Sequence, residues 1–152
     1  MTKINLIEKA IGSGLFTGFI PLAPGTFGSL VGLLIYLIPG FEEPLILIPA
    51  IIIFTFYGIF LGSKFEQAYG KDPGQCTIDE VIGMWITLLF LPKTLMILII
   101  AFFVWRAFDI IKPYPIRKLE AIEGGLGIMI DDVLGGIYSL ITMQLILVFI
   151  IK

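Results

Sequence analysis

The chain has 152 residues, of which 58% are hydrophobic and 14% are charged, whereas about a quarter of the residues in an ordinary globular domain are charged. This composition and a mean hydropathy of +1.04 exclude a typical soluble domain and predict one domain, residues 1–152, embedded in the lipid bilayer. The net charge of −2 provides no basic surface for nucleic acid, so we expect no nucleic-acid partner.

Histidine is absent and Cys76 is the single cysteine of the chain. The chain therefore lacks the commonest general base and the commonest transition-metal ligand. A thiol phosphatase needs an arginine a few residues after its cysteine, and TIDEVIG follows Cys76 instead. Any catalysis must therefore use carboxylates, lysine or arginine, hydroxyls or a hard metal ion.

Residues 10–38 form the first apolar segment, but prolines and glycines between Pro21 and Gly28 interrupt it. Because proline and glycine disfavour the interior of a helix, we expect a short helix, a loop and then a second helix from about Phe27 to Ile38. The first helix of the chain is thus expected to be broken.

The clearest membrane span is Pro44–Ser63, since a spanning helix needs about 20 apolar residues. The next stretch, residues 63–80, is the most polar of the chain. We expect at least its beginning to lie outside the hydrocarbon.

The apolar run Val81–Phe108 is interrupted at Pro92 and Lys93 and has two interpretations. A single crossing would place the polar stretches on either side of it on opposite faces of the membrane. A turn at Pro92 would give two helices of about 12 to 15 residues that cross and return. The hairpin is preferred, because proline and lysine are costly at the bilayer centre and the positive cluster at residues 112–118 favours the cytoplasm.

The last span is expected from about Ile130 to Ile151. The predicted fold class is an all-α, polytopic membrane helix bundle with four or five transmembrane segments, a broken first helix and a helical hairpin that turns at Pro92. In this topology every polar motif lies on one cytoplasmic face.

The segment PLAPGTFGSL, residues 21–30, leads into an apolar helix through a loop rich in proline and glycine. Backbone N–H groups and the helix dipole favour an anion at a helix N-terminus, and the small residues Gly25, Thr26 and Ser29 would let a phosphate approach the backbone. A capped helix that packs closely through its glycines explains the same residues. Both interpretations remain open at this point.

Two pairs of adjacent acids, Asp79–Glu80 and Asp131–Asp132, lie near the start of apolar helices. Interaction with the helix dipole explains one acid in a first turn. Neighbours on a helix point about 100° apart, so the second acid must face the bundle or the lipid. Because charge in lipid is costly, such residues indicate a functional site.

Arg106, Asp109 and Lys112 follow one another at i, i+3 spacing, which places them on one helix face. This row could be a ladder of salt bridges at the membrane interface. It could equally be a phosphate-binding row that includes one metal ligand or base, in which arginine provides bidentate recognition.

Together these motifs place five carboxylates and two cations at the cytoplasmic ends of helices. The surplus of negative charge would not be tolerated in a buried site without a counter-ion. Carboxylates without histidine suit Mg²⁺, which takes oxygen ligands and keeps water and substrate phosphate around it. The sequence therefore predicts a magnesium site.

The motifs APGTFGS, DEVIGMW, FDIIKPYPIR and GGLGIMIDDVLGG, in this order and spacing, closely resemble those of the phosphatidylglycerophosphatase A family. The resemblance covers residues 12–150. It implies a small integral enzyme of the bacterial inner (cytoplasmic) membrane that removes the terminal phosphate of phosphatidylglycerophosphate, with Mg²⁺, on the cytoplasmic side. It carries over as site positions Gly25, Thr26, Ser29, Asp79, Glu80, Arg106, Asp109, Lys112, Asp131 and Asp132.

The expected mechanism is metal-dependent hydrolysis of a lipid phosphomonoester. Asp79, Glu80, Asp131 and Asp132 are expected to hold one or two Mg²⁺ ions and so to activate a bound water. Arg106 and Lys112, with the backbone of residues 26–29, are expected to neutralise the phosphoryl group. Asp109 is a candidate for the group that orients or deprotonates the water, and an aspartyl-phosphate intermediate is an open alternative.

A small ion-coupled transporter or channel subunit is the alternative from another class of protein. The broken first helix and the acids near the membrane suggest it. It predicts polar residues through the membrane centre, whereas the expected spans are almost purely apolar between their ends.

Overall fold

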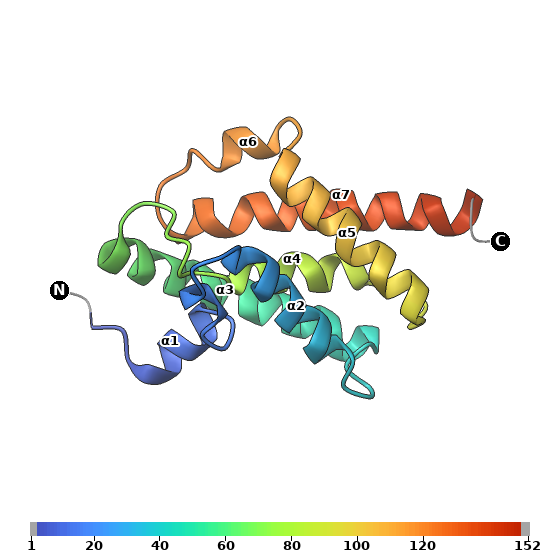
Figure 1. The fold of residues 1–152 in the computed structure, drawn as a ribbon, viewed down its shortest axis with the longest axis horizontal. Helices are drawn as coiled ribbons and strands as arrows, with labels where there is room; N and C mark the ends of the chain where they lie inside the picture. Colours follow the sequence, from blue (N-terminus) through green and yellow to red (C-terminus); the bar gives the residue numbers. More distant parts are fainter. Residues whose placement is uncertain (1–2, 150–152) are drawn as a thin grey trace.

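The computed structural model describes residues 3–149, and within them the chain forms seven α-helices, one short 3-10 helix and no strand (Figure 1). The elements are α1 (Leu6–Gly12), η1 (Thr17–Phe19), α2 (Pro24–Tyr36), α3 (Pro44–Tyr69), α4 (Ile78–Leu88), α5 (Leu95–Ile111), α6 (Ile116–Leu119) and α7 (Gly125–Phe149). The all-α class is confirmed. The end of the last expected span, residues 150 and 151, lies outside the described residues.

The N-terminal segment is broken before α2, as expected, but the single short helix expected there is instead α1, which ends at Gly12, followed by the separate 3-10 helix η1. The helix expected from Phe27 begins earlier, at Pro24, which occupies its first turn. Proline is favoured there because its missing N–H would have no partner within the helix. The earlier start brings Gly25 into the helix and toward the acids described below.

The helix α3 continues to Tyr69 instead of ending near Ser63. Its polar last turns are held by neighbouring elements: Lys64 pairs with Glu8 of α1, and Ser63 Oγ accepts a hydrogen bond from Gly125 N, 3.0 Å away, at the start of α7. These contacts are tertiary, so the local polarity of residues 63–69 did not reveal them.

The third apolar run is divided close to Pro92, since α4 ends at Leu88 and α5 begins at Leu95. The two helices contact each other, and α5 runs back across α4 and α7 (Figure 1). The run therefore forms two helices and not one continuous helix. The start of α4 and the end of α5 lie in the same region of the bundle.

The helix α4 forms the centre of the bundle: it contacts α2, α3, α5 and α7, and ten of its eleven residues are buried. Glycines allow its close approach to the neighbouring helices. A Cβ atom at Gly32 would lie 3.0 Å from the Val81 carbonyl oxygen, and one at Gly136 would lie 2.9 Å from the Gly83 carbonyl oxygen. This packing places the first turn of α4 between α2 and α7.

Two helices, α3 and α7, are long and apolar enough to cross a membrane. Large apolar side chains also point outward from several helices, such as Leu45, Phe56, Phe103 and Leu145. An apolar surface of this extent is unfavourable in water and suits contact with lipid. The bundle thus has the surface of a membrane protein.

Candidate functional site

A polar cavity of about 330 Å³ lies where the starts of α2 and α4, the end of α5 and the first turns of α7 meet. Its lining includes six carboxylates, from Asp72, Asp79, Glu80, Asp109, Asp131 and Asp132. Among the described residues, Lys112 is the cation that lines it. The lining of the cavity therefore contains many more acidic than basic side chains.

Three of these acids, each from a different helix, converge on one point. Glu80 of α4, Asp109 of α5 and Asp132 of α7 each offer one carboxylate oxygen, and the three oxygens lie within 4.8 Å of one another. We call these residues the carboxylate triad. Such a group of oxygen ligands has the chemistry that a hard divalent cation requires.

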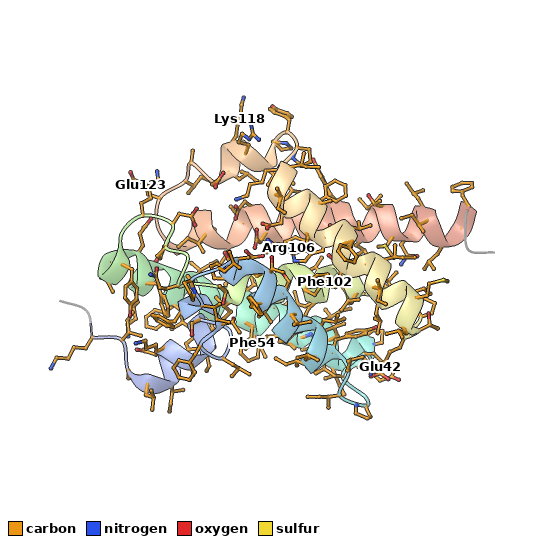
Figure 2. The ribbon with its side chains drawn as sticks, viewed as in Figure 1. Glu42, Phe54, Phe102, Arg106, Lys118 and Glu123 are labelled. Carbon is orange, nitrogen blue, oxygen red and sulfur yellow. The ribbon has the colours of Figure 1, made fainter. Side chains whose placement is uncertain are left out.

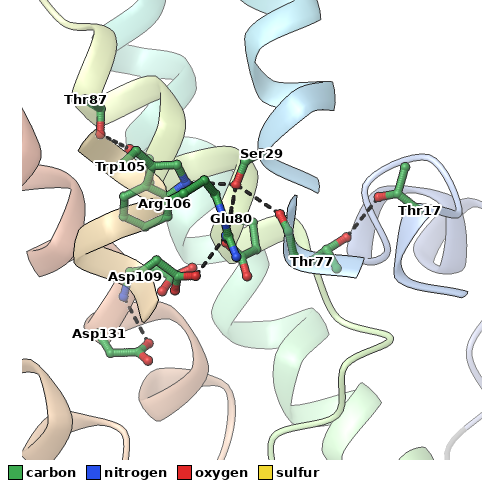
Figure 3. A network of polar contacts seen from close by, with 12 residues as sticks. Thr17, Ser29, Thr77, Glu80, Thr87, Trp105, Arg106, Asp109 and Asp131 are labelled. Carbon is green, nitrogen blue, oxygen red and sulfur yellow. Dashed lines mark hydrogen bonds and ion pairs between the residues drawn. The ribbon is translucent and has the colours of Figure 1, made fainter. Parts of the chain in front are cut away.

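Arg106 holds two members of the triad together. Its Nη1 atom lies 2.7 Å from Glu80 Oε2 and 2.8 Å from Asp109 Oδ2, and it also donates a hydrogen bond to Ser29 Oγ over 3.3 Å (Figure 3). Arg106 is not among the residues that line the cavity. Arg106 is therefore placed to orient Glu80 and Asp109. Phosphate binding by Arg106 stays a prediction.

Lys112 leaves the predicted Arg106–Asp109–Lys112 row, because it ends α5 in a left-handed conformation with φ of 46°. Its Nζ atom lies 2.9 Å from Asp131 Oδ2 and 3.0 Å from Glu120 Oε1. Burial opposes the charged form, but the hydrogen bonds to Asp131 and Glu120 outweigh it and raise the pKa of Lys112 above its ordinary value. Lys112 is therefore a fixed positive charge in the cavity wall.

The adjacent acids of α7 point to different partners. Asp131 is paired with Lys112, whereas Asp132 belongs to the carboxylate triad. Among the described side chains, the buried oxygens Asp79 Oδ1 and Asp132 Oδ2 accept no hydrogen bond. Because a buried carboxylate oxygen without a partner is costly, both atoms indicate a ligand in the cavity.

The loop residues predicted to bind phosphate have unequal positions. Gly25 lines the cavity, and a Cβ atom there would overlap Glu80 Oε1. Thr26 and Ser29 are not among the lining residues. Ser29 is fully buried; its hydroxyl donates to the Gly25 carbonyl, 3.0 Å away, and accepts from Trp105 Nε1 over 2.8 Å.

Three residues that the sequence did not single out belong to this site: Asp72, Trp105 and Glu120. Asp72 lines the cavity with φ of 46°, and the turn sequence Lys-Asp-Pro-Gly was an available signal, since aspartate tolerates this conformation. Trp105 donates a hydrogen bond to Ser29, and Glu120 accepts one from Lys112. No local sequence pattern indicated either contact.

Cys76 also lines the cavity, but its environment does not favour a nucleophile. Burial is the main cause that raises the pKa of the Cys76 thiol well above its ordinary value, and the nearby Asp79 carboxylate adds to this effect. The reactive form of cysteine is the thiolate, so the structure agrees with the expectation that Cys76 is not a phosphatase nucleophile.

Comparison with known proteins gives consistent matches. A family model described as phosphatidylglycerophosphatase A matches residues 10–147. The chain is 39% identical over 149 residues to a Bacteroides thetaiotaomicron protein provisionally named a phosphatidylinositol-3-phosphatase, with 93% of this chain and 94% of that protein covered.

Two further relatives carry the name phosphatidylglycerophosphatase A. The Haemophilus influenzae protein is 38% identical over 149 residues, with 93% of this chain and 87% of that protein covered. The Escherichia coli protein is 35% identical over 138 residues, with 89% and 78% covered. No solved structure matches the chain significantly.

Proposed function

We propose, from the premise that this chain belongs to the phosphatidylglycerophosphatase A family, that it hydrolyses the terminal phosphate monoester of phosphatidylglycerophosphate to give phosphatidylglycerol. The observation that carries the proposal is the carboxylate triad of Glu80, Asp109 and Asp132 in a cavity at the ends of lipid-facing helices. A lipid phosphate at head-group depth can reach such a cavity, and the scissile bond need not enter the bilayer.

The residues present fit a Mg²⁺ ion. The donor set consists of carboxylate oxygens, which Mg²⁺ prefers, and Asp132 contributes an oxygen that no described side chain satisfies. We therefore assign the carboxylate triad as the ligands. Relative to the four ligands expected from the sequence, this assignment adds Asp109 and gives Asp79 and Asp131 other roles.

Bound Mg²⁺ supplies Lewis acidity toward a phosphoryl oxygen and lowers the pKa of a coordinated water. The remaining steps belong to the chain's own residues. Arg106 keeps Glu80 and Asp109 at their positions. Lys112 presents its ammonium group to the phosphoryl oxygens and offsets the charge that develops on them.

Asp79 is assigned as the group that orients the attacking water and accepts its proton. Its Oδ1 atom is buried in the cavity wall and has no hydrogen-bond partner among the described side chains. The oxygen of the water forms a bond to phosphorus as the bond from phosphorus to the glycerol oxygen breaks. The leaving alkoxide takes up a proton from solvent water, Asp79 returns its proton to solvent, and phosphate and phosphatidylglycerol leave.

The site is assigned to the cytoplasmic face of the bacterial inner membrane, in a bundle with four or five membrane segments. The starts of α2, α4 and α7 and the end of α5 surround one cavity, so they lie at one end of the bundle. Residues 112–118 follow this end and contain the densest cluster of lysine and arginine in the chain, which favours the cytoplasmic side.

Phosphatidylinositol 3-phosphate is the second candidate substrate, because the Bacteroides thetaiotaomicron relative bears the name of that activity. Both lipids carry a phosphate monoester beyond an uncleaved phosphodiester. The transporter alternative is not favoured, since the family and the named relatives are phosphatases.

The deciding experiment measures phosphate release by the purified protein from each of the two lipids, with Mg²⁺ and with a chelator. We expect release from phosphatidylglycerophosphate that requires Mg²⁺ and is lost in Asp132→Asn. Faster release from phosphatidylinositol 3-phosphate would transfer the proposal to the second lipid. Equal release with chelator would refute the metal assignment.

A further inference from the structure

A second hollow, of about 450 Å³, lies beside the catalytic cavity at the end of α5 and along α6. Its lining residues are Ile111, Lys112, Pro113, Tyr114, Arg117 and Lys118. We call it the basic hollow, because it contains three cations and none of its lining residues is acidic. Neither the metal site nor the hydrolytic step uses Arg117 or Lys118.

We propose that the basic hollow binds the phosphodiester of the lipid substrate, the phosphate group that remains after hydrolysis. The inference rests on the proposed function in one respect only, that the substrate is a phospholipid with a monoester beyond its diester. Arg117 and Lys118 are then the residues that distinguish such lipids from simple phosphomonoesters.

The two sites are neighbours, because Lys112 lines both of them. A substrate with two phosphates joined by a short polyol needs two adjacent anion sites. The acid-rich cavity suits a monoester that arrives with a divalent cation, whereas a diester carries one negative charge and is better recognised by cations directly. The charge pattern of the two sites therefore matches the two ends of the head group.

The side chains around the basic hollow also suit a position at the membrane interface, where a lipid phosphodiester lies. Ile111 is 63% exposed and Tyr114 is 75% exposed, and an apolar residue beside an exposed tyrosine is typical of the membrane interface. Lys118 lies on α6, outside the bundle, and points away from it (Figure 2). Its Nζ atom lies 5.0 Å from the centre of the Tyr114 ring.

Arg117 has donors available for an anion. Its Nη2 atom donates one hydrogen bond to the Ile111 carbonyl over 3.3 Å, and its side chain is exposed. A guanidinium group has five N–H donors, so a phosphodiester oxygen can be bound without breaking an ion pair. Lys112, by contrast, pairs with Asp131 and Glu120 and is assigned to the monoester in the catalytic cavity.

The first test is the kinetic effect of Arg117→Ala with Lys118→Ala in mixed micelles of phosphatidylglycerophosphate. Loss of charge-assisted hydrogen bonds worth about 1.5 kcal/mol corresponds to a KM about tenfold higher, and we expect kcat to change by less than about twofold. The charge-preserving pair Arg117→Lys with Lys118→Arg should restore most of the affinity. Lys93→Ala, at the opposite end of α5, is the matched control for loss of a positive charge.

Phosphatidic acid provides the matched control substrate, since its monoester is attached directly to the diacylglycerol and it has no phosphodiester. We expect the ratio of kcat/KM for phosphatidylglycerophosphate over phosphatidic acid to fall about tenfold in the double alanine variant. An equal rise of KM for both lipids would overturn the proposal, because it would indicate general attraction to anionic surfaces. An unchanged KM for phosphatidylglycerophosphate would overturn it as well.

A binding measurement separates this inference from the proposed function. Short-chain phosphatidylglycerol has the diester without the monoester, and its affinity for the protein can be measured by calorimetry without any turnover. We expect about tenfold weaker binding to the double alanine variant, with a smaller difference at high salt because the contacts are exposed. Equal binding to both proteins would refute the basic hollow as a diester site even if the enzyme is active.

Discussion

Arg106 Nη1 lies 2.7 Å from Glu80 Oε2, and this ion pair joins α5 to the first turn of α4 across 26 positions of sequence. The same guanidinium contacts Asp109 Oδ2. One arginine thus fixes the separation of two carboxylates that repel each other, which is the condition for a preorganised cation site.

The first prediction concerns Arg106→Lys. A lysine is a point charge without the planar fork of arginine and cannot hold both acids in the same geometry. We expect kcat for phosphate release to fall by about a hundredfold, which corresponds to roughly 2.7 kcal/mol. Lys93→Gln, far from the cavity, should retain wild-type kcat, and a wild-type rate in Arg106→Lys would contradict the orienting role.

The second prediction separates the two aspartates of α7. Asp132→Asn removes a triad ligand, so we expect it to abolish the Mg²⁺-dependent rise in melting temperature that binding to the folded state produces. Asp131→Asn removes a partner of Lys112 and should lower kcat while the Mg²⁺-dependent rise remains. The melting temperature in detergent, measured against Mg²⁺ concentration, checks both. A similar rise in both variants would contradict the assignment of Asp132.

The third prediction uses two glycines of the same cavity. In Gly25→Ala the new methyl group would overlap Glu80 Oε1, so Glu80 must move away from the triad, and we expect kcat to fall by about tenfold or more, that is by about 1.4 kcal/mol. In Gly74→Ala the nearest atom, Pro24 Cγ, would lie at an ordinary contact distance of 3.7 Å. We expect Gly74→Ala to keep near wild-type kcat; an equal loss in both variants would show that the cavity tolerates no added methyl group.

The fourth prediction concerns the attacking group. If water attacks phosphorus directly, a single turnover in ¹⁸O-labelled water should place one label in the released phosphate and none in the protein. Because water that attacks the phosphorus of an aspartyl-phosphate also leaves the carboxyl group unlabelled, the peptide that contains Asp131 and Asp132 and the peptide that contains Asp79 are also examined by mass spectrometry after an acid quench, for a phosphorylated aspartate. A phosphorylated aspartate, or label in any of these carboxyl groups, would establish an aspartyl-phosphate intermediate and refute direct attack.

The fifth prediction concerns topology. Lys93 precedes the start of α5, and Lys118 lies in α6, beyond the end of α5. If α4 and α5 form the proposed membrane hairpin, we expect Lys93→Cys and Lys118→Cys to react with a membrane-impermeant thiol reagent from opposite sides. The native Cys76 is buried, and the unsubstituted protein provides the background. Reaction of both variants from the same side would refute the proposed arrangement.

The helices and the polar motifs were predictable from the sequence because their causes are local. Apolar runs predicted the two helices long enough to cross a membrane, α3 and α7. Prolines and glycines precede α2, and Pro92 lies in the gap between α4 and α5. Proline acts on its own backbone and on the preceding turn, so such breaks can be located without tertiary information. The family motifs likewise named five of the six acids that line the cavity.

The partners of those acids depended on the tertiary structure. Sequence spacing put Asp79 with Glu80 and Asp131 with Asp132, yet the structure groups Glu80, Asp109 and Asp132 and pairs Asp131 with Lys112. Adjacent residues on a helix point about 100° apart, and only the rotation of each packed helix decides which of them faces the cavity.

That rotation is set by contacts between distant residues. The glycine at position 136 lets α7 approach α4, and the glycine at position 83 leaves room for the Trp105 ring of α5. The left-handed turn at Lys112 redirects its side chain from the Arg106 row to α7. The sequence by itself determined which residues could form a cation site. Helix packing, which depends on side-chain shape across the bundle, decided which of them meet.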